Sequence, residues 1–225
     1  MKNILNKYFF SFFILIFVLI PGCTSRLYII DKPISFSEER ILLTKEYIKN
    51  HYGVNEVVYI TPKMIVLHWT AINDFDSCLA LFNMETLGGG RPDLNKAGDL
   101  NVSIHFLVDK RGKVFQLMPD TLMARHCIGL NYSSIGVENV GGENDIYNLT
   151  DEQIEANILL ARYLKEKYPS IEYLIGHYEY RKFENSPLWL ERDSTYRTEK
   201  VDPGERFMQS VRNGVADLKL NDAVE

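Results

Sequence analysis

Cysteine is scarce in this sequence, since its 225 residues include only three. A small disulfide-stabilised scaffold is therefore excluded, because such domains carry many cysteines in a short chain. An excess of basic residues is also lacking: 25 lysines and arginines stand against 30 aspartates and glutamates, and the pI is about 5.6. This balance argues against a general nucleic-acid-binding protein, which needs a positively charged surface.

The sequence has no apolar run long enough to cross a membrane as a helix. The longest run, FFSFFILIFVLI, has twelve residues, whereas a spanning helix needs about 20. It follows Lys2 and Lys7 with no acidic residue between, which is typical of a secretory signal. The next residues, IPGC, resemble the cleavage region of bacterial lipoproteins. We therefore expect residues 1–22 to be a lipoprotein signal peptide and Cys23 to be the lipidated N-terminus; an ordinary signal peptide with an incidental cysteine is the alternative.

A lipid anchor at Cys23 has consequences for the location of the protein. Each buried acyl CH₂ group contributes about 0.8 kcal/mol, so several acyl chains anchor a protein firmly. Without residues 1–22 the formal charge is −7, because 23 basic residues stand against 30 acidic ones. We expect a domain held by its lipid, not by its own charge, in the bacterial cell envelope, at the outer membrane and facing the periplasm.

Hydrophobic periodicity and turn residues predict a mixture of helices and strands after the signal. Because strands and helices intermix and at least one hairpin is predicted, the fold class is α/β: a single domain with a mixed central β-sheet flanked by helices. The segment 87–99 is predicted to be a long loop. Helices are predicted within 37–53, 74–85, 149–169 and 202–215, strands within 64–69, 133–142 and 171–180, and a hairpin within 101–118.

Two of the predicted helices have specific expected features. The first is expected to bury a stripe that includes Leu42 and Ile48, and to leave His51 solvated near its end. In the last helix Asp202 suits the N-cap and Pro203 the first helical position.

Two histidines lie near the ends of predicted strands, His68 and His177. The ends of strands are where α/β proteins place ligands and catalytic groups, although either histidine alone is more often a satisfied core or edge residue. Asp202 is a candidate third group, even if it also caps a helix. Two imidazoles and one carboxylate, with a fourth position open to water, form a catalytic zinc set. No short motif of the HExxH kind is present, so the spacing does not establish the site.

Five segments, in order along the chain, resemble the zinc-dependent N-acetylmuramoyl-L-alanine amidases of the type-2 amidase family. That family shares its fold with peptidoglycan-recognition proteins and a bacteriophage lysozyme. The resemblance extends over about Ile65–Phe207 and implies a zinc amidase domain at 61–218, preceded at 23–60 by a linker and an N-terminal helical extension. The segments are VLHWTA, NVSIHFLVDKRGKVFQL, RHCIGLNYSSIGVEN, IGHYEY and KVDPGERF.

The resemblance implies a role for five residues in metal binding and catalysis. His68, His177 and Asp202 match the zinc ligands. Glu138, the acid in SIGVE, matches the general base or electrostatic partner. Lys200, two residues before the aspartate, matches the lysine that steadies the developing oxyanion.

Further residues are assigned to the substrate groove on the same resemblance. His126 matches a histidine that lines the groove, and Asn131 and Trp69 are expected to bind substrate with it. His105 matches a histidine frequent in its strand, and core packing is the preferred interpretation for it. The 24 residues between the second histidine and Asp202 exceed the usual spacing, which predicts an added loop near the site.

That added loop contains Trp189 and Tyr196, which could form walls of the groove. The remaining cysteines, Cys78 and Cys127, are expected to be small buried residues, although a pair in an oxidising compartment is possible.

The activity that the resemblance implies is hydrolysis of the amide bond between the lactyl group of N-acetylmuramic acid and L-alanine, with Zn²⁺ as cofactor. The expected partners are peptidoglycan or muropeptides and, through the lipid anchor, a membrane. One alternative is a non-catalytic peptidoglycan-binding module of the same fold. Another is a cysteine peptidase that uses Cys127 or Cys78 with a histidine.

Overall fold

The structure is a computed structural model that describes residues 26–223, apart from 56, 89–91 and 143–147. The predicted signal peptide at 1–22 and the predicted lipidation site at Cys23 lie outside the described residues. In the described part, no helix combines the length and the apolar character needed to cross a bilayer.

Six strands form a single mixed sheet in the order β1-β4-β3-β5-β2-β6. Only β3 and β4 pair antiparallel among the strands described, as the predicted hairpin requires, and the other neighbours are parallel. The predicted α/β fold class is confirmed. The strands are β1 (Ile29–Asp31), β2 (Met64–Trp69), β3 (Phe106–Val108), β4 (Val114–Gln116), β5 (Ser134–Asn139) and β6 (Tyr173–Gly176).

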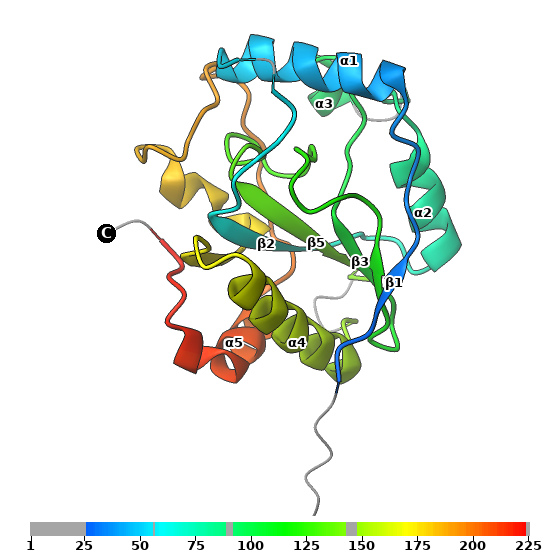
Figure 1. Cartoon of the computed structure of the whole chain (residues 1–225), viewed down its shortest axis with the longest axis vertical. Coiled ribbons are helices and arrows are strands. Elements are labelled where there is room, and N and C mark those ends of the chain that lie inside the picture. The colour runs from blue at the N-terminus through cyan, green and yellow to red at the C-terminus, as the bar shows by residue number, and fades with distance from the viewer. Residues whose placement is uncertain (1–25, 56, 89–91, 143–147, 224–225) are drawn as a thin grey trace, which may run out of the picture.

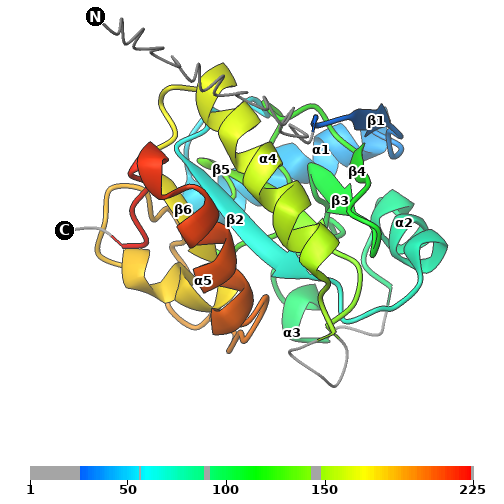
Figure 2. The same cartoon turned by 90° about the horizontal axis from the view of Figure 1, so that it is seen from below.

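Helices cover both faces of this sheet (Figures 1 and 2). Helices α4 and α5 lie side by side on one face, whereas α1 lies on the opposite side. The α-helices are α1 (Glu38–Tyr47), α2 (Phe75–Asn83), α3 (Pro92–Asn95), α4 (Asp151–Lys167) and α5 (Glu205–Gly214). A π-helix follows α1 at Ile48–Tyr52, and 3₁₀-helices span His177–Phe183 and Ala216–Leu218. Neither β1 nor α3 was predicted, because both lie in segments whose composition indicated a linker or a loop.

The strand alternation of β2 divides its side chains between two cores. Ile65 and Leu67 pack with residues of α4 and α5, whereas Met64 and Val66 pack on the other face. Since successive side chains of a strand point to opposite faces, His68 lies on the face of Met64 and Val66, away from α4 and α5. The strand therefore presents its histidine on the side of the sheet where α1 lies.

The buried face of α1 differs from the predicted stripe. Leu42 is 66% exposed, and Arg40 and Thr44 are buried instead. The Arg40 guanidinium donates hydrogen bonds to the carbonyl oxygens of Phe82 and Met84, at 3.0 and 2.7 Å. These carbonyls end α2 and lack helical partners, so a buried cation is favourable there. The periodicity of apolar residues could not show this, because the buried contact is polar.

His51 is buried, contrary to the expectation of a solvated residue. Its Nδ1 atom lies 3.0 Å from both carboxylate oxygens of Glu191, and its Nε2 atom lies 3.1 Å from the carbonyl oxygen of Ala97. Glu191 belongs to the added loop. The histidine thus ties this loop to the helical segment between β1 and β2, which no local pattern indicated.

The last helix begins later than predicted. Its N-cap is Gly204, with φ of 86°, and α5 starts at Glu205. The prediction that Asp202 caps this helix is therefore wrong, because the chain turns into the helix only after Pro203. The carboxylate of Asp202 is left for the histidines.

Candidate metal site and catalytic pocket

The parallel pairing of β2 with β6 brings two distant histidines to one edge of the sheet. His68 is the fifth of the six residues of β2, and His177 directly follows the last residue of β6. Because parallel strands place their carboxyl ends at the same edge, both side chains reach one place. The Asp202 carbonyl accepts a hydrogen bond from the backbone N–H of Tyr178 at 3.1 Å, which holds the third segment beside them.

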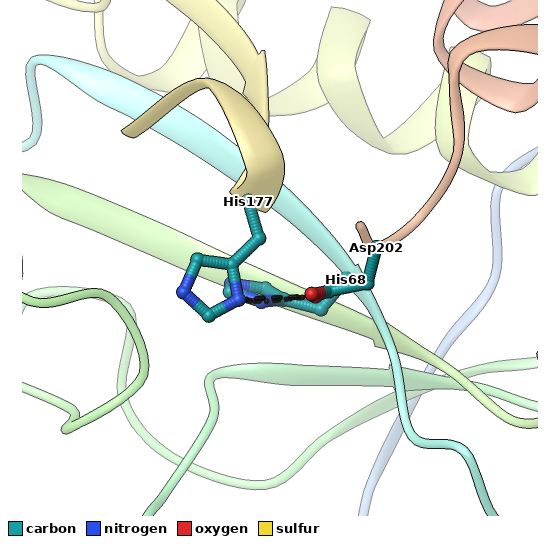
Figure 3. A group of neighbouring side chains, drawn as sticks. All are labelled: His68, His177 and Asp202. Carbon is teal, nitrogen blue, oxygen red and sulfur yellow. Dashed lines mark hydrogen bonds and ion pairs between the residues drawn. The ribbon is translucent and has the colours of Figure 1, made fainter. Parts of the chain in front are cut away.

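The three side chains converge on one point, as Figure 3 shows. The Nδ1 atoms of His68 and His177 are 2.9 Å apart. The Oδ2 atom of Asp202 lies 3.2 Å from the first and 3.0 Å from the second. All three residues are buried, and their ligand atoms lie within 4.8 Å of one another. Two imidazoles and a carboxylate are ligands that zinc prefers, so the donor set fits a divalent cation.

The ionisation of the three residues also suits a cation. Burial, and then the neighbouring His177, lower the pKa of His68 to about 4. Burial raises the pKa of Asp202, but the neighbouring His177 and then His68 bring it below its ordinary value. His68 is thus neutral and Asp202 ionised near pH 7, which are the states in which these groups bind metals.

Glu138 lies beside His68 on the next strand. The two residues are direct partners in the parallel register of β2 and β5. Burial raises the pKa of Glu138 well above its usual value, and the charge of Asp202 adds to this while Lys200 opposes it. Its Oε2 atom is buried and has no hydrogen-bond partner among the described residues. A carboxyl group with a raised pKa and a free oxygen is suited to take up and release a proton.

A cavity of about 240 Å³ opens over these groups. Lys200, Trp69 and His126 line it together with the metal-site residues and Glu138, and so does Tyr196 of the added loop. Trp189, the other aromatic residue of that loop, instead stacks on the Tyr180 ring with a centroid distance of 5.9 Å. The predicted roles of these residues toward substrate stay predictions.

Asn131 also lines the cavity, but its amide is engaged within the protein. Its Oδ1 atom accepts hydrogen bonds from the backbone N–H groups of His126 and Cys127, at 2.8 and 2.6 Å. Its Nδ2 group donates to the hydroxyl of Tyr52 at 2.8 Å. The side chain thus links the segment that carries His126 to the π-helix, and its predicted contact with substrate stays a prediction.

Two residues near the site were missed in the sequence. Ser134 Oγ lies 3.2 Å from Nε2 of His126, and Asn139 Nδ2 donates to the His68 carbonyl at 3.0 Å. Both lie on β5, next to β2 in the sheet. No motif indicated them: the Ser134 contact crosses the turn that follows His126, and the Asn139 contact depends on which strands are neighbours.

His105 is a core residue, as its preferred interpretation predicted. It is 0% exposed; its Nε2 atom lies 2.8 Å from the Leu122 carbonyl oxygen, and its Nδ1 atom accepts from the Gly136 N–H at 2.9 Å.

Cys78 and Cys127 are both free and buried, which confirms the expectation that they are small buried residues. Burial raises the pKa of the Cys78 thiol to about 11 and raises that of Cys127 as well.

Together, the sheet and the site define a class of protein: an α/β domain with a buried His-His-Asp set and a carboxyl group beside it, typical of metal-dependent hydrolases. The sequence model of the N-acetylmuramoyl-L-alanine amidase family (Amidase_2) matches residues 59–205. The chain belongs to this type-2 amidase family, and this membership supports a peptidoglycan amidase activity.

A solved amidase structure shows the same fold. The chain is similar to the N-acetylmuramoyl-L-alanine amidase LysC from Clostridium intestinale URNW, with 21% identity over 87% of this chain and 100% of that chain, and a TM-score of 0.51. It is also similar to a selenomethionine derivative of AmpD, with 26% identity over 70% of this chain and 90% of that chain, and a TM-score of 0.48. No curated protein matches the sequence.

Proposed function

We propose that the chain is a zinc-dependent N-acetylmuramoyl-L-alanine amidase. It hydrolyses the amide bond between the lactyl group of N-acetylmuramic acid and the L-alanine of the stem peptide. The observation that carries the proposal is the convergence of His68, His177 and Asp202 at one buried point. The family match supports the same activity.

His68 and His177 would hold Zn²⁺ through their Nδ1 atoms, and Asp202 through its carboxylate. A zinc ion held there supplies Lewis-acid chemistry, because it polarises an amide carbonyl and acidifies water. One carboxylate with two neutral imidazoles leaves the loaded site net positive, which favours a developing anion.

Glu138 and Lys200 carry the proton and the charge in this proposal. Glu138 takes a proton from the attacking water and returns it to the leaving amine, a contribution of roughly 10²–10⁴-fold for general acid–base catalysis. Its raised pKa and its free Oε2 atom support this role. Lys200 lines the same cavity and stabilises the negative oxygen of the tetrahedral intermediate, which is worth roughly 3–4 kcal/mol for one well-placed donor.

The two alternative functions are less well supported. A binding module of this fold needs no metal set, whereas here the three candidate ligands and Glu138 are all in place. A cysteine peptidase needs an accessible thiolate. Cys78 and Cys127 are buried, and burial raises the pKa of both thiols.

The cellular setting belongs to the same proposal. With lipid on Cys23, the domain at 61–218 would be held in the cell envelope, at the outer membrane facing the periplasm, with residues 23–60 between the anchor and this domain. The lipoprotein-like IPGC sequence after the apolar run supports this location. Palmitate labelling that is lost in Cys23→Ala is the expected result.

Incubating purified protein with defined muropeptides, with and without a strong zinc chelator, tests the activity. Mass spectrometry should show free stem peptide beginning with L-alanine, formed only without chelator. The His177→Ala variant should bind no stoichiometric zinc and form no product. Normal cleavage by this variant contradicts the proposal, and activity that resists chelation but not thiol alkylation favours a cysteine peptidase.

A further inference from the structure

Both ring nitrogens of His68 are engaged, and they face different side chains. Its Nδ1 atom lies in the candidate ligand set. Its Nε2 atom lies 3.0 Å from Nδ1 of His126, and the two rings meet edge to face at 87°. Hydrogen-bond partners of this kind decide which nitrogen of a neutral histidine carries the proton.

The proton positions on the two histidine rings follow from the hydrogen bonds of Ser134, which contacts His126 on the side away from His68. The hydroxyl of Ser134 donates to the Leu130 carbonyl oxygen at 2.8 Å, because a carbonyl can only accept. Its Oγ atom can therefore accept the Nε2–H of His126, which lies 3.2 Å away. A neutral imidazole carries one N–H, so Nδ1 of His126 accepts. The remaining donor is the Nε2–H of His68.

This arrangement leaves the lone pair of His68 Nδ1 free to face His177 and Asp202. The opposite tautomer would place a proton at Nδ1, where a cation is to bind. We propose that His126 and Ser134 are positioning residues, which fix His68 in its Nδ1-ligating tautomer and orientation. This inference rests on the metal binding of the proposed function and adds to the groove-lining role predicted for His126.

The surroundings of His126 are built to hold its ring in place. The Asn131 side chain accepts a hydrogen bond from the His126 backbone N–H at 2.8 Å. The ring packs against the backbone of Gly136, where an added Cβ would lie only 2.7 Å from the His126 Nδ1 atom. Glycine at this position of β5 therefore lets the ring approach His68. A His126 ring held this way can fix the ring rotation of His68 as well as its tautomer.

Zinc affinity of the metal-free protein, measured by competition with a chromophoric chelator, tests the inference without relying on activity. His126→Leu removes the Nδ1 atom that accepts the hydrogen bond from the Nε2–H of His68. We expect zinc affinity to fall roughly 10–100-fold, as for other groups that orient metal ligands. His126→Asn places an amide oxygen near the position of Nδ1, so its affinity should stay close to that of the wild type. This pair separates loss of the acceptor from loss of ring volume.

Two serine variants form a matched control. Ser134→Ala removes the acceptor of the His126 Nε2–H and should weaken zinc binding less than His126→Leu does. Ser133→Ala removes a hydroxyl that donates to the same Leu130 carbonyl, at 3.3 Å, and should leave zinc affinity unchanged. In the zinc-loaded wild type, ¹⁵N spectra should show the His68 proton on Nε2, and this resonance should change in His126→Leu.

Zinc binding of His126→Leu at wild-type affinity, or equal weakening by the leucine and asparagine variants, overturns the positioning role. Thermal melting of the metal-free variants controls for folding. If the leucine variant does not fold, the asparagine variant is compared with the wild type in its place. If the wild type binds no zinc, the proposed function fails with the inference. If it binds zinc and cleaves muropeptides while all His126 variants bind equally well, only the inference fails.

Discussion

Two buried histidines, His105 directly before β3 and His68 on β2, have opposite surroundings. Backbone groups engage both ring nitrogens of His105, namely the Leu122 carbonyl and the Gly136 N–H. The ring nitrogens of His68 face side chains, His126 on one side and the candidate ligands on the other. Burial lowers the pKa of both to about 4. Burial and pKa therefore do not distinguish a core histidine from a candidate ligand, but the partners of its two nitrogens do.

The sharpest test of this contrast is removal of His68 itself. His68→Ala should abolish stoichiometric zinc binding and lower muropeptide cleavage at least about 1,000-fold, because the Lewis-acid contribution is lost. Metal analysis and product mass spectrometry measure the two effects. Retained zinc at one equivalent in this variant would show that the histidine is not a ligand.

Glu138 should separate catalysis from metal binding. Glu138→Gln keeps the shape of the side chain but cannot accept a proton, so we expect kcat to fall roughly 10²–10⁴-fold. Zinc affinity should stay near the wild-type value, because Glu138 is not in the ligand set. Chelator competition and steady-state kinetics measure both quantities. A variant with normal kcat would exclude Glu138 as the general base.

His105 should behave in the opposite way from His68. His105→Leu leaves the Gly136 N–H and the Leu122 carbonyl without their partner, and each unsatisfied buried group costs roughly 1–3 kcal/mol. The free energy of unfolding, from urea titration of the metal-free protein, should therefore fall by about 2–6 kcal/mol. The folded variant should still bind one zinc. Loss of zinc from folded protein would place this histidine in the site after all.

The pH dependence of stability gives the mildest test. The pKa of His105 is about 4 in the folded protein, owing mainly to burial, and about 6.5 in an unfolded chain. The unfolded state therefore binds a proton first as the pH falls. Neutral His105 contributes stability above pH 6.5 that is lost progressively down to about pH 4, up to about 3 kcal/mol.

Comparison of the wild type with His105→Leu isolates this contribution, since the other histidines are common to both. Urea titrations at several pH values should show that the wild type loses more stability than the variant over this acid range. Parallel pH profiles for the two proteins would contradict the lowered pKa.

Local sequence patterns predicted much of the fold. The helices expected within 149–169 and 74–85 are α4 and α2, which begin at a capping box of Thr150 and Gln153 and at an Asp74 cap. What the sequence could not show depends on pairing between distant segments. Arg40 is buried because carbonyls of α2 lie against it, and Glu191 holds His51 from 140 residues away.

The candidate site divides in the same way. The order of the five sequence segments and their similarity to the amidase family singled out His68, His177 and Asp202. The structure places these residues within reach of one cation. Ser134 and Asn139 were not singled out, because serine and asparagine on a strand are common. Ser134 contacts His126, and the pairing of β2 with β5 brings Asn139 to the His68 carbonyl.

Anomalous diffraction at the zinc edge, from crystals grown with one equivalent of zinc, tests the central claim most directly. The account predicts one peak, about 2.0–2.2 Å from Nδ1 of His68, Nδ1 of His177 and a carboxylate oxygen of Asp202. A peak at any other place, or no peak between these three side chains, would contradict it.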